Sequence, residues 1–169
     1  YSARFNDDDS AYLSRTPSAG NRKTWTWSGW VKRSSLAGAA VVLMYTGSGG
    51  GVARGGIVFN SSEQLEMQMN PTGSAWKYIK TNALHRDTSA WYHIVAVLDT
   101  TQATESNRQK LYVNGTEQTL SSSSYPTLNQ DYPFNLGTPH YIGSDVSGGS
   151  NYDGYLAEVN FVDGQALTP

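Results

Sequence analysis

The chain has 169 residues, contains no cysteine and carries a formal net charge of −2. This length favours one domain, which we expect to span residues 1–169 as part of a longer polypeptide. Without cysteine there is no disulfide framework, no thiolate metal site and no cysteine nucleophile. Charged residues make up only 15% of the chain and the basic ones are scattered, which argues against nucleic acid as a partner. The longest apolar stretch, residues 39–45, is too short to cross a bilayer.

The first half of the chain follows a period of two residues, the pattern of a β-strand with one buried face. Residues 24–32 and 64–70 alternate most clearly. Shorter strands are predicted over residues 56–59 and 77–80. The apolar positions of the two alternating segments predict core residues: Trp25, Trp27, Val31, Leu65, Met67 and Met69.

The segment 91–98 is apolar on both faces, which is typical of a central strand in a two-layer sandwich. This interpretation also places Trp91 in the core. Further along, Asn114 and Gly115 separate two strand-like runs. Because both residue types tolerate positive φ, this pair predicts a tight hairpin.

Strands over residues 140–143 and 155–162 complete the pattern, and only residues 101–107 could hold a helical turn. The sequence therefore predicts an all-β fold, an antiparallel two-sheet β-sandwich. Three Gly/Ser clusters are interpreted as exposed connections between strands: residues 47–51, 121–124 and 147–150.

Six short motifs follow one another along nearly the whole chain: FNDDDSAY at 5–12, WSGWVK at 27–32, WYHIV at 91–95, LYVNG at 111–115, YIG at 141–143 and GYLAEVNF at 154–161. In this order they resemble the laminin G-like, concanavalin A-like jelly-roll family. The resemblance implies the sandwich fold, with residues 5–12 as its first hairpin. Such jelly rolls commonly bind glycans or proteins, so the fold does not decide the function.

A narrower resemblance rests on residues 5–12, 86–93 and 155–169, the last ending in DGQALTP. These segments are similar to jelly-roll modules in virion and tail-fibre proteins of marine tailed phages. The resemblance implies a structural or adsorption role, at the virion surface or in the extracellular space.

Some relatives on this fold are glycoside hydrolases, which need two carboxylates on one face of a strand. Their E-x-D-x-x-E motif does not occur in this sequence. Glu63 and Glu66 are three residues apart, so a strand would direct them to opposite faces. The Gly-x-Ser-x-Gly nucleophile motif occurs nowhere outside the Gly/Ser loops. We therefore predict that the chain is not an enzyme.

Calcium is the cofactor that the sequence suggests. Asp7, Asp8 and Asp9 concentrate three carboxylates in one turn, and hard cations prefer oxygen ligands. The alternative is a solvated turn whose Asp side chains accept hydrogen bonds from nearby backbone amides.

A glycan site needs aromatic ring faces for the sugar and a few polar groups for its hydroxyls. Aromatic residues outside the core periodicity, with their polar neighbours, give the predicted ligand-binding set: Trp76, Tyr78, Tyr125, Tyr132, Asn151, Tyr152 and Asp153. For the loop tyrosines, the alternative is packing over the end of the sandwich.

The resulting hypothesis is a non-enzymatic recognition module of a phage-like virion that binds host-surface glycans for adsorption. The alternative is a virion structural or decoration module that mediates protein–protein assembly, as a homo-oligomer or with a fibre protein. A lectin would bind free glycan as an isolated domain, whereas an assembly module would bind itself or a virion partner. We expect neither nucleic-acid binding nor membrane insertion.

Overall fold

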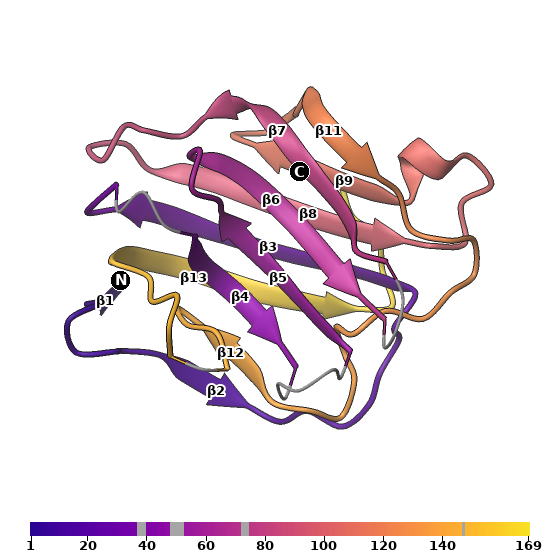
Figure 1. Ribbon diagram of the computed structural model, residues 1–169, viewed down its shortest axis with the longest axis horizontal. Helices are drawn as coiled ribbons and strands as arrows, with labels where there is room; N and C mark the ends of the chain where they lie inside the picture. Colours follow the sequence, from indigo (N-terminus) through magenta and orange to yellow (C-terminus); the bar gives the residue numbers. More distant parts are fainter. Residues whose placement is uncertain (37–39, 48–52, 72–74, 147) are drawn as a thin grey trace.

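A computed structural model describes residues 1–36, 40–47, 53–71, 75–146 and 148–169 of the chain. Two antiparallel sheets face each other, and the seven-stranded sheet lies in front in Figure 1. In spatial order, the six-stranded sheet consists of β1 (Ala3–Phe5), β13 (Gly154–Asp163), β3 (Thr24–Arg33), β8 (Tyr92–Asp99), β9 (Gln109–Val113) and β10 (Thr116–Glu117).

The seven-stranded sheet consists of β11 (Leu120–Ser124), β7 (Lys77–Leu84), β6 (Gln64–Asn70), β5 (Arg54–Phe59), β4 (Val41–Thr46), β12 (His140–Ile142) and β2 (Leu13–Arg15). Within the described residues, the one helical element is the short 3₁₀ turn η1 (Glu105–Asn107), inside the segment predicted to hold it. The predicted antiparallel two-sheet β-sandwich is confirmed.

The core lies between the two sheets and follows the predicted alternation. Leu65, Met67 and Met69 of β6 are fully buried, and so are Trp25 and Trp27 of β3. Since successive strand residues point to opposite faces, the intervening positions of β6 face outward. The interior is therefore built by the residues with period-two spacing in the sequence.

The central-strand prediction also holds, because β8 lies between β3 and β9 in the six-stranded sheet. Trp91 differs from its prediction: it precedes the strand and is 37% exposed. It therefore does not contribute a buried ring to the core.

Two further predictions are corrected by the pairing of the strands. Residues 5–12 do not form a hairpin, since β1 pairs with β13 while β2 pairs with β12 in the opposite sheet. This segment instead crosses from one sheet to the other. The Ser-rich segment 121–124 is part of β11 and pairs with β7 rather than forming a loop. In the other two Gly/Ser clusters, residues 48–51 and 147 lie outside the described part of the chain.

The Asn114–Gly115 hairpin forms as predicted, with φ values of 51° and 81°. Asn114 Oδ1 accepts a hydrogen bond of 2.8 Å from the His93 N–H. We expect Asn114→Ala to lower the free energy of unfolding by about 1–2 kcal/mol, since alanine disfavours positive φ and removes this acceptor. Asn114→Gly still allows positive φ and removes only the hydrogen bond, so we expect it to lower the free energy of unfolding less than Asn114→Ala does. Urea unfolding measures both, and equal stability of Asn114→Ala and the parent would contradict the assignment.

Candidate functional site

The outer face of the seven-stranded sheet carries a continuous line of residues, one from each strand. Directly opposed residues of antiparallel strands point to the same face. The pairing of neighbouring strands therefore aligns Ser14, Tyr141, Tyr45, Gly56, Gln68, Tyr78 and Ser124. We call these seven residues the tyrosine row. The row faces outward because the neighbours of Gln68 along β6 are buried Met67 and Met69.

Gly56 lies near the middle of the tyrosine row and is buried. A Cβ atom at this position would lie 3.3 Å from Tyr45 Cδ2 and 3.2 Å from a methyl group of Val58. The Tyr45 ring thus lies close to the glycine backbone, where a larger residue would crowd it. Gly56 thus adds no side chain of its own between Tyr45 and Gln68.

A second line adjoins the tyrosine row and contains Arg54, Asn70 and Trp76. Arg54 pairs with Asn70 across β5 and β6. Its guanidinium lies 5.1 Å from the centre of the Trp76 ring. The Arg54 side chain also lies near the Tyr45 hydroxyl. Burial raises the pKa of Tyr45, and Arg54 opposes part of this increase, so the hydroxyl stays protonated at neutral pH. Arg54 thereby links Tyr45 to Trp76.

Tyr78 is held from two sides. The Lys80 ammonium lies 4.9 Å from the centre of the Tyr78 ring, and Ser122 Oγ donates a hydrogen bond of 3.4 Å to the Tyr78 hydroxyl. Lys80 also forms an ion pair of 3.5 Å with Glu66 on the same face. These contacts arrange half-buried aromatic rings, amides and charged groups on one sheet surface before any ligand arrives. Such a surface suits a ligand with both C–H faces and hydroxyl groups.

Of the predicted ligand-binding residues, Trp76 and Tyr78 come together on this surface, beside Gln68 and Asn70. Sequence analysis missed Tyr45 and Tyr141 as members of the same surface. A bulge between Val42 and Met44 breaks the alternation of β4, so the direction of Tyr45 is not readable from spacing. Tyr141 reaches the row because β12 pairs with β4, although nearly a hundred residues separate them in the sequence.

Three predicted tyrosines lie elsewhere. Tyr132 and Tyr152 are fully buried, so their prediction as ligand-binding residues is wrong. The Tyr132 hydroxyl accepts a hydrogen bond of 3.0 Å from the Thr127 N–H, and the Tyr152 hydroxyl donates one of 2.7 Å to the Lys32 carbonyl. Burial raises the pKa of Tyr152. Tyr125 packs partly against the core and lines a smaller cavity beside β9 and β11.

Asn151 and Asp153 lie apart from the tyrosine row, near the start of β13. Asn151 Nδ2 donates to the Gly148 carbonyl at 3.1 Å and contacts Ser10 Oγ at 3.4 Å. Asp153 forms an ion pair of 3.5 Å with Arg4. These contacts bring the segment before β13 close to the turn that follows β1.

The predicted calcium ligands do not converge on one point. Asp9 Oδ2 accepts a hydrogen bond of 2.8 Å from Asn6 Nδ2, and Asp7 Oδ1 accepts one of 3.1 Å from the Asp8 N–H. Across the described residues, no group of three or more His, Asp or Glu side chains is placed to hold a metal ion. The three carboxylates therefore do not form a ready ligand set, and this geometry fits the solvated-turn alternative.

The two glutamates considered for catalysis serve different contacts. Glu63 forms a buried ion pair with Arg33, whereas Glu66 pairs with Lys80 on the outer face. They do not face each other across a common substrate position. In the described segments, no helix is long and apolar enough to cross a membrane.

Comparisons with solved structures identify similar sandwiches. The CBM40 module of the Ruminococcus gnavus IT-sialidase matches with a TM-score of 0.62 and 13% identity over 94% of each chain. The same module has been solved bound to α2,3-sialyllactose. The native heptameric SAP-like pentraxin of Limulus polyphemus matches with a TM-score of 0.58 and 16% identity, over 93% of this chain and 71% of that one.

A third similar structure is tailspike protein 2 of the Escherichia coli O157:H7 bacteriophage CAB120. Its TM-score is 0.61 at 18% identity, over 94% of this chain and 22% of the tailspike. At such identities the similarity establishes the fold alone. A comparison with curated proteins finds no match. Residues 5–169 match the laminin G-like family described as the concanavalin A-like lectin/glucanases superfamily. The chain therefore belongs to the concanavalin A-like lectin/glucanases superfamily.

Proposed function

We propose that this chain is a non-enzymatic glycan-binding module that uses the tyrosine row and Trp76 as its binding surface. The observation that carries the proposal is the alignment of Tyr141, Tyr45, Gln68 and Tyr78 across one sheet. Aromatic faces would contact the C–H surfaces of a sugar, and the amide of Gln68 would bind its hydroxyls.

The biological setting we propose is adsorption of a phage-like virion to glycans on the host surface, with the module at the virion surface or in the extracellular space. The similarity to the sialyllactose-bound CBM40 module supports glycan binding, and the similarity to the phage tailspike supports the virion setting. Both are relatives in fold. Neither defines which glycan this chain would bind.

The experiment is a glycan array of bacterial and algal polysaccharides, probed with the full chain in calcium and again in EDTA. Specific binding in both arms supports the tyrosine row as a metal-independent site. Binding that is lost in EDTA would instead assign the site to a metal and bring Asp7–Asp9 back as its ligands. Absence of binding in both arms, together with self-association in solution, would favour the assembly role.

For any glycan on the array that binds the chain, we expect Trp76→Ala and Tyr78→Ala each to weaken binding about tenfold, the equivalent of one lost stacking contact. Isothermal titration calorimetry measures the affinities. Trp30→Ala is the matched control, because Trp30 is 42% exposed on the outer face of the other sheet. Equal losses in Trp30→Ala and Trp76→Ala would exclude the tyrosine row as the binding surface.

A further inference from the structure

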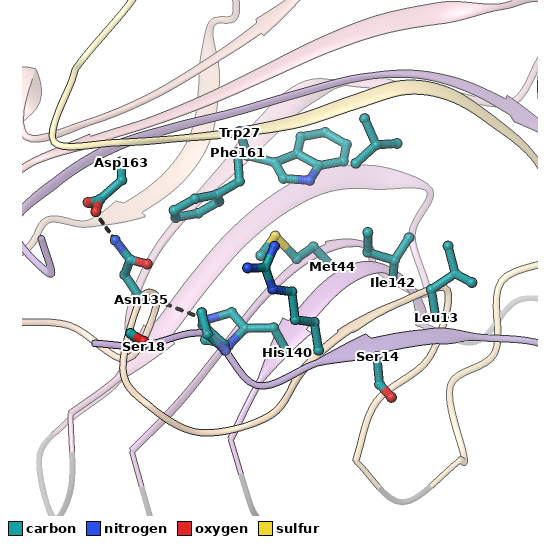
Figure 2. Close-up of a pocket in the computed structure, with 13 residues that line it drawn as sticks. Leu13, Ser14, Ser18, Trp27, Met44, Asn135, His140, Ile142, Phe161 and Asp163 are labelled. Atoms are coloured by element: carbon teal, nitrogen blue, oxygen red, sulfur yellow. Dashed lines mark hydrogen bonds between the residues drawn. The ribbon is translucent and has the colours of Figure 1, made fainter. Parts of the chain in front are cut away.

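A cavity opens at one edge of the sandwich, between β2 and β12 of one sheet and β13 of the other. It has a volume of about 520 Å³, which lies in the range of small-molecule pockets. Trp27, Met44, Ile142 and Phe161 supply apolar surface from both sheets, as Figure 2 shows. The cavity lies between the sheets, whereas the tyrosine row covers an outer face.

The edge strands explain why the cavity is open. β2 and β12 are three residues long, and the residues of β2 are all exposed. Their pairing sets Leu13 opposite Ile142 and Arg15 opposite His140. All four of these residues line the cavity, so these short strands form one wall and the longer β3 and β13 form the other.

Trp27 brings an unused hydrogen-bond donor to this cavity. Its side chain is fully buried, and its indole Nε1–H has no acceptor among the described residues. In Figure 2 the indole nitrogen lies on the side of the ring that faces Met44. Buried donors are nearly always hydrogen-bonded, so an oxygen acceptor in the cavity would complete this site.

The unused hydrogen-bond donors of the lining favour an anion. Within the described chain, Arg15 forms no ion pair or hydrogen bond. His140 is neutral, because its Nε2 accepts from the Asn135 N–H at 3.1 Å and its Nδ1–H donates to the Thr138 carbonyl at 2.8 Å. Asp163 is the other charged group of the lining, and its Oδ1 accepts from the Asn135 side chain at 2.6 Å and from the Asn21 N–H at 2.8 Å. Arg15 is therefore the charged group of the lining whose hydrogen-bonding atoms have no partner among the described residues.

We propose that this edge cavity binds a small amphiphilic monoanion, an aliphatic or aromatic carboxylate. Its apolar part fills the space between Trp27, Met44 and Phe161, and its oxygens supply the acceptors that Trp27 and Arg15 lack. This second site is distinct from the proposed glycan surface, because it shares only Ser14 with the tyrosine row and contains none of its tyrosines. A cationic amphiphile would meet Arg15 as a like charge and would leave the donors of Arg15 and Trp27 without an acceptor, so we expect it not to bind.

The test uses the full chain labelled with ¹⁵N and titrated with decanoate. Five indole N–H signals are expected, one for each tryptophan, and the Trp27 signal is the one that is lost in Trp27→Phe. We expect decanoate to move the Trp27 signal downfield and to leave that of Trp25 in place. Trp25 is the matched control, since its Nε1–H is equally buried and unpaired but lies outside the cavity lining.

Calorimetry gives a second readout that does not depend on Trp27→Phe being folded. We expect Arg15→Gln to weaken decanoate binding about tenfold and Arg86→Gln, at an exposed arginine outside the lining, to leave it unchanged. Decyltrimethylammonium, with the same chain and the opposite charge, should not bind. The proposal is overturned by a Trp27 signal that stays fixed at millimolar decanoate, or by equal affinities of Arg15→Gln and the parent.

Discussion

Replacing Arg33 with methionine is expected to lower the free energy of unfolding by about 3–5 kcal/mol, the cost of leaving a buried charge without its partner. Arg33 is 1% exposed at the end of β3 and forms an ion pair with Glu63 of the β5–β6 turn. Its Nη1 also donates to the His85 carbonyl at 2.9 Å, and its guanidinium lies 4.6 Å from the centre of the Phe59 ring. One side chain of the six-stranded sheet thus holds three residues on the opposite sheet.

A double variant separates the lost charge from the lost packing. Arg33→Met/Glu63→Gln also removes the buried carboxylate. We therefore expect its free energy of unfolding to be at least about 2 kcal/mol higher than that of Arg33→Met alone. Glutamine is the suitable partner because Glu63 has φ of 65°, and a residue of the same shape does not change the backbone strain there. Urea unfolding at neutral pH gives both values. A single variant as stable as the parent, or a double variant as unstable as the single one, would show that the charge is not what Arg33 compensates.

The strands of the core were predictable because each carries its own signal. Leu65, Met67 and Met69 alternate with polar residues, and this alternation is enough to define a buried face. The Asn114–Gly115 turn is equally local, since both residues adopt the positive φ that their chemistry favours. No information from distant parts of the chain was needed for either prediction.

The errors came from positions where distant pairing decides the structure. Residues 5–12 look like a hairpin locally, but β1 and β2 join different sheets because their partners, β13 and β12, lie there. The Ser-rich residues of β11 become a strand because β7 offers an unpaired edge. Tyr132 lies in a loop by sequence, yet the loop folds inward and buries the ring. Local composition does not encode these partners.

The candidate site shows the same limit. Trp76 and Tyr78 were predictable as aromatic residues outside the core pattern, but the surface they join depends on the six registers that connect the seven strands. Tyr141 of β12 and Tyr78 of β7 are assigned to one surface only after β4, β5 and β6 are placed between them. The sequence therefore indicates which aromatic residues are candidates for ligand binding, whereas the strand pairing determines which of them lie on one surface.

The second large effect concerns pH. Burial, followed by the nearby Arg33 charge, lowers the pKa of His85 to about 4. In the unfolded chain this pKa is about 6.5, so between these values the unfolded state binds more protons and stability falls as the pH falls. We expect a loss of about 2 kcal/mol by pH 5 and about 3 kcal/mol by pH 4 from this residue. The contribution is fully present above pH 7.

His85→Phe isolates this contribution from the other groups that titrate in the same range. The His85 ring contacts Phe59 and Tyr92 with centroid distances of 5.7 and 5.4 Å, and its Nε2 has no partner among the described residues. Phenylalanine preserves these ring contacts and the backbone carbonyl that binds Arg33. Urea unfolding from pH 8 to pH 4 should therefore give variants of similar stability at pH 8 and a His85→Phe advantage that grows below pH 6.5. Parallel pH profiles would mean that His85 is protonated without cost in the fold, and that Arg33 and the surrounding apolar contacts do not exclude its charge.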